Sequence, residues 1–434
     1  MYRTLLTQLE KWRCKANRKP LILSGARQVG KTWLLKEFGR LYFKNVAYIA
    51  LDGNPAVANF FKAGYSDINR LIVGLSAATG VPMVPDETLL ILDEIQVCPE
   101  ALTSLKYWQE TAPGYAVVAA GSLLGLQLQP GSGYPVGKTD ALTLFPLSFG
   151  EFLMALEERG LAELIAAADY PLVKAFSPRL QEFLALYFFV GGMPAAVNAF
   201  LENRNPGDAR SVQKALLLDF ERDFAKHVPT AQVARLRAIW QSMPLQLSRQ
   251  DKRFVAKEVP GVRQARDLHD PFVWLESAGL CHRVWNVTKP FLPLASYRNH
   301  LFKCFGVDVG LLAAQSAVPA KAILEKNRLF TEFKGALTEQ YVQQELRAVC
   351  GIEPYYWAQP NSQAEVDFLI QSDDGVIPVE AKAERNLKAK SLSVYQDKYH
   401  PTLAIRTSLA DYSKRNGLLD IPLYALAALP SELA

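Results

Sequence analysis

The sequence has few cysteines and histidines and no long apolar run, and these shortages exclude several classes of protein. Its five cysteines are scattered without a CxxC pair, which argues against a disulfide framework and against a structural zinc site. No apolar run approaches the roughly 20 residues that a membrane-spanning helix needs. Polar residues interrupt Leu5, Leu6 and Leu9, so the first residues lack the apolar core of a signal peptide. These shortages predict a cytoplasmic protein without a membrane partner.

What the sequence does have is the composition of an ordinary folded protein. Hydrophobic residues make up 50% and charged residues 21% of the chain, and no low-complexity tract suggests disorder. A length of 434 residues allows about two to four domains, each with a core of its own. The net charge of +5 permits a nucleic-acid partner without establishing one.

Short apolar runs recur through the first third of the chain. They span residues 21–24, 46–52, 88–93 and 115–121, with a plausible last strand at 141–147. Each is apolar on both faces, as buried parallel strands are, and the intervals between them have helical periodicity. This alternation predicts a doubly wound α/β domain with a parallel sheet.

The middle of the chain is predicted to be mainly helical. Apolar residues recur at helix spacing from 149 to about 226, and short helical stretches then precede an alternating strand at 280–285. Helices followed by a hairpin-like strand suggest a winged helix-turn-helix. Residues 232–270 contain eight Arg or Lys and four Asp or Glu. This excess fits a DNA-contacting surface, and it fits a solvated helix face almost as well.

The most informative motif is the octapeptide GARQVGKT, which follows the first apolar run and opens a helical pattern. It matches GxxxxGK[ST], in which glycines let successive backbone N–H groups point at phosphate oxygens beside a helix N-terminus. The alternative is a tight turn with a surface lysine. We expect the whole octapeptide to bind a nucleoside triphosphate, with Lys31 reaching the β- and γ-phosphates and Thr32 offering its hydroxyl to Mg²⁺. Its residues are Gly25, Ala26, Arg27, Gln28, Val29, Gly30, Lys31 and Thr32.

A second motif supplies the partner of the first. Residues 89–94, LLILDE, read as an apolar strand that ends in two carboxylates. Asp93 is expected in the magnesium shell, and Glu94 can polarise the attacking water. A small-molecule kinase would also carry a loop of the GxxxxGK[ST] type, but it would not need a glutamate at position 94.

The strand at 46–52 lies between these two motifs, and this arrangement resembles the additional-strand branch of P-loop ATPases, which includes the AAA+ group. In that branch a polar residue after the next strand senses the γ-phosphate, which makes Ser122 the matching candidate. A helix N-cap is the alternative role for Ser122.

Several phrases together resemble a family of prokaryotic predicted ATPases of the AAA type with a C-terminal DUF4143 region. They are residues 23–32, LDEIQ at 92–96, GS at 121–122, PLSFGEF at 146–152, GGMP at 191–194, FGVDVGLL at 305–312 and EVDF at 365–368. The resemblance implies a P-loop ATPase core at 1–150 and a helical lid region at 151–228. It further implies a winged helix-turn-helix at 229–312 and a restriction-endonuclease-like domain at 313–434. AAA-type sites often lie between subunits, so a homo-oligomer is expected as well.

One position departs from that family. Members usually have Gly-Arg shortly before the last strand of the core, whereas this chain has Gly137-Lys138. An arginine there could spread transition-state charge through its planar fork, and lysine offers only a point charge. We therefore expect ATP binding to survive better than turnover, unless another arginine such as Arg222 serves; rapid multiple turnover would contradict this expectation.

The C-terminal part contains a second candidate active site. Asp367, Glu380 and Lys382 fit the D…ExK pattern of restriction-like nucleases, because Glu380 and Lys382 share one strand face and Asp367 lies on the other strand of a predicted hairpin. Asp367 and Glu380 could hold Mg²⁺ while Lys382 positions or activates the attacking hydroxide. The resemblance adds Glu339 on the preceding helix as a fourth residue of the site and its third acid. The alternative is a charged outer face of the strand.

Two functions from different classes follow from these motifs. The first is a Mg²⁺-dependent ATPase whose nucleotide state moves a winged-helix and a nuclease-like module on DNA. The second is a nucleotide-driven regulatory switch or scaffold in which the C-terminal acids cut nothing. ATP and Mg²⁺ are the expected cofactors under both.

Overall fold

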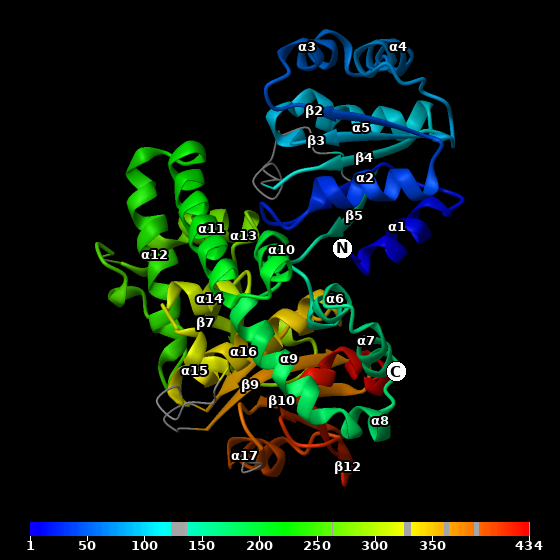
Figure 1. Cartoon of the computed structure of the whole chain (residues 1–434). Coiled ribbons are helices and arrows are strands. Elements are labelled where there is room, and N and C mark those ends of the chain that lie inside the picture. The colour runs from blue at the N-terminus through cyan, green and yellow to red at the C-terminus, as the bar shows by residue number, and fades with distance from the viewer. Residues whose placement is uncertain are drawn as a thin grey trace. The chain divides into compact units, whose positions relative to one another are not determined.

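Figure 1 shows a computed structural model of the chain. It describes residues 1–122, 135, 137–262, 264–324, 331–359, 364–385 and 390–433. The chain divides into two compact units, which are described separately. The N-terminal unit comprises Arg3–Phe145 and Val273–Leu280, and the C-terminal unit comprises Met1–Tyr2, Pro146–Phe272 and Cys281–Ala434.

The N-terminal unit is built on a five-stranded sheet in the order β2-β3-β4-β1-β5. Every neighbouring pair of strands is parallel. All residues of β3 and β4 are buried, as expected for strands covered by helices on both faces. The strands are β1 (Leu21–Ser24), β2 (Asn45–Ala50), β3 (Thr88–Asp93), β4 (Ala116–Ala120) and β5 (Asp140–Thr143).

This strand order confirms the predicted fold of the ATPase core. The strand expected at 46–52 is β2, and it pairs with β3 in the same sheet. The carboxyl ends of β1, β3 and β4 lie at one edge, which is where ligands bind in open parallel sheets. The helices of this unit are α1 (Leu5–Arg13), α2 (Lys31–Tyr42), α3 (Pro55–Gly64), α4 (Ile68–Thr79), the 3₁₀ turn η1 (Ile95–Val97) and α5 (Pro99–Thr111).

The C-terminal unit begins with a run of helices, as its sequence periodicity predicts. Pro lies in the first turn of several of these helices, where its missing N–H is tolerated. The run comprises α6 (Phe149–Ala155), α7 (Arg159–Ala166), α8 (Tyr170–Ala175), α9 (Ser177–Val190), α10 (Pro194–Asn203), α11 (Pro206–His227), α12 (Thr230–Ser248) and the turns η3 (Ala256–Glu258) and η4 (Ala265–Leu268). Helix α13 (His269–Ser277) follows and contributes residues to both units.

One mixed sheet of eight strands forms the rest of this unit, in the order β12-β13-β11-β10-β9-β8-β6-β7. Its strands are β6 (Cys281–Val287), β7 (Arg298–Gly306), β8 (Tyr355–Ala358), β9 (Glu365–Ser372), β10 (Gly375–Ala381), β11 (Ala404–Ser408), β12 (Ser413–Arg415) and β13 (Leu418–Pro422). Its helices are α14 (Val309–Gln315), α15 (Ala320–Leu324), α16 (Thr331–Ala348), α17 (Lys390–Tyr399) and α18 (Leu429–Leu433), with the turns η5 (Leu294–Tyr297) and η7 (Leu423–Ala428).

The sheet bears on two expectations from the sequence. Strands β9 and β10 are antiparallel neighbours with Gly375 opposite Ser372, so the expected hairpin is present. The hairpin of β6 and β7, which the sequence analysis assigned to a winged helix, pairs through β6 with β8. One sheet therefore crosses residue 312, where a domain boundary was expected. The winged-helix and restriction-endonuclease-like assignments stay predictions.

Three of the family phrases meet in one buried polar junction of the C-terminal unit. Leu147 N–H donates to the Gly192 carbonyl at 2.7 Å, and Gly192 N–H donates to Asp308 Oδ2 at 2.7 Å. A Cβ on Gly192 would lie 2.1 Å from the Leu147 carbonyl oxygen. Glu345 Oε1 accepts from the Phe149 N–H at 2.9 Å at the start of α6. These phrases therefore have a packing role, because only small residues and specific acceptors allow the backbones to approach.

Candidate functional site

The loop between β1 and α2 has the backbone that a phosphate cradle needs. Gln28 and Gly30 are left-handed, with φ of 64° and 96°, and Gly25 has φ of 145°. A Cβ on Gly25 would lie 2.3 Å from the carbonyl oxygen of Leu144, next to β5. The loop thus turns tightly against the neighbouring backbone and delivers Lys31 to the first turn of α2. Such turns orient successive N–H groups toward one point and create an anion-binding concavity.

Lys31 is almost fully buried and lies back across this loop. Its Nζ donates to the carbonyl oxygens of Gly25 and Ala26, at 2.8 Å each. Burial lowers the Lys31 pKa to about 8, and the nearby carboxylates of Glu94 and Asp93 offset only part of that effect. The ammonium therefore has carbonyl partners inside the cradle and sits close to the end of β3.

A short hydrogen bond joins the end of β3 to the first turn of α2. Thr32 Oγ1 donates to Asp93 Oδ2 at 2.6 Å, and Tyr48 Oη on β2 donates to the same oxygen at 3.1 Å. The other oxygen of Asp93 accepts from the Glu94 backbone N–H at 3.0 Å. Burial and the Asp93 charge raise the Tyr48 pKa to about 12, so its hydroxyl stays a donor. A hydroxyl and a carboxylate side by side are ligands that Mg²⁺ prefers, so this pair fits the expected ion.

Glu94 adopts an unusual backbone conformation directly after the strand. Its φ is +52°, and its carboxylate accepts from Gln96 Nε2 at 2.5 Å. Left-handed backbone at a non-glycine residue is costly and clusters at functional positions. Sequence reasoning assigned a role to Glu94 but none to Gln96, although Gln96 belongs to the phrase LDEIQ, and none to Tyr48.

The structure also places the candidate γ-phosphate sensor. Ser122 follows β4, is 3% exposed, and its Oγ accepts from Arg27 Nε at 3.3 Å. The loop and the end of β4 are therefore in contact, although the sensor role of Ser122 stays a prediction. Lys138 pairs with Glu110 at 3.0 Å on the surface of the N-terminal unit. Arg222 pairs with Asp219 at 3.0 Å and is largely exposed on α11.

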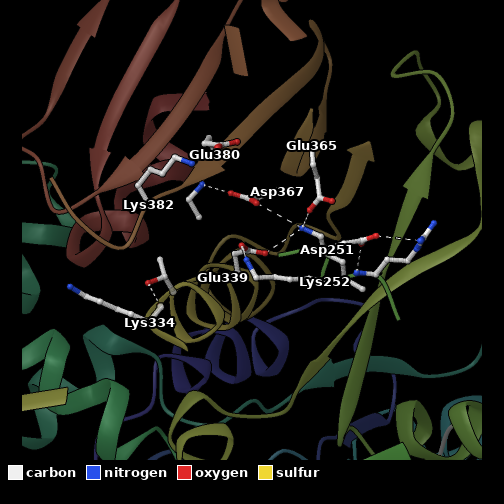
Figure 2. Close-up of polar contacts among 12 residues, drawn as sticks. Asp251, Lys252, Lys334, Glu339, Glu365, Asp367, Glu380 and Lys382 are labelled. Atoms are coloured by element: carbon white, nitrogen blue, oxygen red, sulfur yellow. Dashed lines mark hydrogen bonds and ion pairs between the residues drawn. The ribbon is translucent and has the colours of Figure 1, made fainter. Parts of the chain in front are cut away.

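Asp367, Glu380 and Lys382 lie close together on the β9–β10 hairpin (Figure 2). Val379 is opposite Phe368 across the two strands, and the Ala381 N–H donates to Asp367 Oδ2 at 2.8 Å. Lys382 Nζ lies 2.5 Å from Glu380 Oε1. The structure thus brings the D…ExK residues together.

Two further lysines reach these acids, and sequence reasoning missed both. Lys303 on β7 has no exposed side-chain surface, and its Nζ lies 2.5 Å from Glu365 Oε1, 3.3 Å from Glu339 Oε2 and 3.8 Å from Asp367 Oδ1. Lys252 pairs with the other oxygen of Glu339. The signal available for Lys303 was a charged residue between the apolar residues Phe302 and Cys304 of its strand. We call the set of seven residues the acid–lysine cluster: Lys252, Lys303, Glu339, Glu365, Asp367, Glu380 and Lys382.

Charges of opposite sign in the cluster stabilise one another, whereas the charge of Glu339 works against ionisation of Asp367. Burial alone would lower the Lys303 pKa, but the carboxylates of Glu339, Glu365 and Asp367 raise it well above its ordinary value. Burial works against ionisation of Glu339, yet Lys252 and Lys303 lower its pKa to about 2. Burial and the charge of Glu339 raise the Asp367 pKa well above its usual range. In the part of the chain that the structure describes, no three His, Cys, Asp or Glu side chains are grouped so that they could hold a metal ion.

The basic segment at 232–270 is partly neutralised by ion pairs. Four of its cations have acidic partners: Arg237 with Glu221, Arg249 with Glu258, Lys252 with Glu339 and Arg253 with Asp251. Glu258 and Asp251 already count among the four acids of the segment, so only the pairs with Glu221 and Glu339 reduce its positive excess further.

Comparison with family models assigns three regions of the chain. Residues 17–153 match an AAA domain, residues 181–322 match a domain of unknown function, DUF8612, and residues 334–426 match another, DUF4143. The resemblance to AAA-type predicted ATPases with a C-terminal DUF4143 region is confirmed. No curated protein matches the chain.

Solved structures similar to this chain share little sequence with it. A Walker-type ATPase of Pyrococcus abyssi is 14% identical with a TM-score of 0.46, over 72% of this chain and 94% of that one. The Aeropyrum pernix ORC1 protein in complex with DNA is 15% identical with a TM-score of 0.27, over 74% and 92%. CDC6P from Pyrobaculum aerophilum is 16% identical with a TM-score of 0.26, over 74% and 94%. Among the described residues, no helix combines the length and apolarity needed to cross a bilayer.

Proposed function

We propose that this chain, which combines an AAA domain with a DUF4143 region, binds ATP with Mg²⁺ and hydrolyses it at the loop between β1 and α2. The observation that carries the proposal is the 2.6 Å hydrogen bond from Thr32 Oγ1 to Asp93 Oδ2. It joins the two motifs that the sequence separates by 61 residues. A turn with a surface lysine would not need a buried carboxylate at this point.

Each residue of the site has a role that its contacts support. The backbone of residues 25–30 and the Lys31 ammonium would bind the phosphates, and Thr32 and Asp93 would hold the magnesium ion. That ion, when bound, neutralises charge on the phosphate oxygens. The Glu94 carboxylate would accept the proton of the attacking water, and Gln96 would hold that carboxylate in place. Tyr48 would keep Asp93 oriented through its hydroxyl.

Transfer to water is favoured over transfer to a small-molecule acceptor. A kinase needs to position an acceptor hydroxyl, whereas a glutamate directly after the magnesium-binding aspartate is suited to a water molecule. The released product separates the two reactions, because hydrolysis yields inorganic phosphate and a kinase yields a phosphorylated acceptor.

The proposal for the C-terminal unit is that it responds to the nucleotide state and contacts DNA. The basic excess at 232–270 supports DNA as the partner, and the ion pairs of Arg237 and Lys252 with acids outside the segment weaken this support. A homo-oligomer and a cytoplasmic location belong to the same proposal. Binding to labelled duplex DNA should differ between ATP and ADP and should fall with salt; equal binding in both nucleotides and at all salt concentrations would count against it.

The ATPase proposal is tested with labelled ATP and three variants of the full chain. We expect Lys31→Ala to lose ATP binding, and Glu94→Gln to bind ATP while losing hydrolysis by about 10²- to 10⁴-fold. Glu163→Gln is the matched control, because Glu163 is an exposed carboxylate paired with Arg159 on α7. A wild-type chain that binds no ATP, or a Glu94→Gln variant that hydrolyses it at the wild-type rate, would refute the proposal.

A further inference from the structure

We infer that the Lys303 ammonium is the resident cation of the acid–lysine cluster, so that this site holds no divalent metal and the D…ExK residues do not cleave phosphodiesters. The inference concerns the C-terminal unit and does not depend on ATP hydrolysis. The D…ExK pattern could belong to a nuclease site that binds a metal ion or to a site whose cation is a lysine side chain, and the inference favours the second.

The first support is the position of Lys303 among the carboxylates. Its Nζ is within 3.8 Å of oxygens from three of them, Glu339, Glu365 and Asp367. A Mg²⁺ ion between these acids would need the same oxygens, because it prefers oxygen ligands at about 2.1 Å in octahedral geometry. An ammonium and a dication cannot both occupy that space.

The second support is that Lys303 cannot easily leave. Its backbone pairs with Val284 of β6 on one side and forms a bridge with Arg253 on the other. Phe254 N–H also donates to the Phe302 carbonyl at 2.8 Å. Lys303 is thus held between two segments, and the bridge to Arg253 brings the adjacent Lys252 to Glu339. The backbone of Lys303 is thus fixed in the sheet, and its side chain has no exposed surface.

The third support is the charge balance of the cluster. Its four carboxylates face three ammonium groups, so the formal charges nearly cancel before any metal is added. A dication would leave a net positive charge in a buried place, where uncompensated charge is costly. A nuclease site that recruits Mg²⁺ needs a larger excess of negative charge than the one formal charge left by four carboxylates and three ammonium groups.

The oxygens of Asp367 and Glu380, the two acids of the D…ExK pattern, are also mostly occupied. Asp367 Oδ2 accepts from the Ala381 N–H, and its Oδ1 faces Lys303. Glu380 Oε1 pairs with Lys382, which leaves Glu380 Oε2 as a buried oxygen without a hydrogen-bond partner among the described residues. Even for Mg²⁺, which keeps several waters, one such oxygen is a poor site.

Mn²⁺ alone, followed by electron paramagnetic resonance, tests this assignment on the full chain. All samples carry Lys31→Ala and Asp93→Asn, so that the N-terminal unit contributes no nucleotide-linked metal. We expect this background and its Glu380→Gln version to bind Mn²⁺ identically. Lys303→Met keeps the length of the side chain and removes its charge, and it should gain about one Mn²⁺ site that adding Glu380→Gln abolishes.

Each outcome decides the question. Mn²⁺ binding by the background that Glu380→Gln removes would overturn the inference, and so would a folded Lys303→Met variant that gains no site. If Lys303→Met fails to fold, the comparison of the background with Glu380→Gln still gives the answer. The wild-type chain should leave supercoiled plasmid intact in Mg²⁺ or Mn²⁺; nicking that Lys382→Ala abolishes would also refute the inference. Failure of the wild-type chain to bind ATP would refute the proposed ATPase and leave this inference standing.

Discussion

Raising the pH from 7 to 9 should weaken ATP binding about tenfold, because it removes the charge of Lys31. Burial lowers the pKa of this lysine from 10.5 to about 8. With that pKa about nine tenths of the side chains are charged at pH 7 and about one tenth at pH 9. If the ammonium is what meets the phosphates, the affinity follows this fraction, which corresponds to about 1.4 kcal/mol.

The direction of the proton exchange follows from the same shift. ATP brings negative charge to Lys31 and raises its pKa, so binding at pH 8 should take up about half a proton per site. In the unliganded chain the lowered pKa of Lys31 means that its charged form destabilises the fold, whereas a lysine in a salt bridge stabilises the fold when charged. Between pH 8 and pH 10.5 the unfolded chain binds more protons at this site than the folded chain, so this site's contribution to stability rises with pH across that window.

Isothermal titration calorimetry in buffers of different ionisation enthalpy measures both the affinity and the proton uptake. Lys31→Arg is the matched control, because arginine stays charged across the range. It should bind ATP less tightly than the wild type, since its fork does not reproduce the lysine geometry, but with little pH dependence. An affinity that is flat from pH 7 to 9.5 in the wild type, or equal pH dependence in both proteins, would show that the reasoning about Lys31 is wrong.

Three further predictions concern other positions. Tyr48→Phe removes the hydroxyl that holds Asp93; we expect hydrolysis to fall about three- to tenfold with ATP affinity nearly unchanged, and an unchanged rate in a steady-state phosphate-release assay would contradict this role. Gly192→Ala places a Cβ 2.1 Å from the Leu147 carbonyl oxygen; we expect a loss of about 2–3 kcal/mol in denaturant unfolding, and a midpoint equal to that of the wild type would mean that the junction is looser than it looks. Lys138→Arg supplies a planar fork at the position where the family usually has arginine; we expect turnover to rise at least about tenfold, and an equal or lower rate would exclude this position as the charge-stabilising group.

The local geometry of the candidate nucleotide site was largely predictable because its parts are short and continuous in sequence. The glycines and Lys31–Thr32 lie within one octapeptide. Asp93 ends a strand that is apolar between Thr88 and Asp93, and Glu94 follows it. Parallel strands whose carboxyl ends meet at one edge bring such motifs together whatever the loops between them. The octapeptide and the strand therefore sufficed to identify this part of the fold.

The residues that support these motifs were not predictable in the same way. Tyr48 lies on the neighbouring strand, and only the pairing of β2 with β3 brings its hydroxyl to Asp93. Gln96 looks like any polar residue after a strand until the left-handed turn at Glu94 directs it back. No local pattern distinguishes such positions from solvated ones.

The C-terminal unit shows most clearly how far the sequence alone predicts a site. The sequence by itself determined the β9–β10 hairpin and the common location of Asp367, Glu380 and Lys382, because hairpin register follows from alternation and a turn. The tertiary structure alone decided what faces these acids. Lys303 comes from a strand 64 residues before Asp367 in the chain, and its charge reaches the carboxylates only because β6, β7, β8 and β9 belong to one sheet. A motif fixes which groups are present, but the electrostatic environment of each group is set by every segment that folding brings near it.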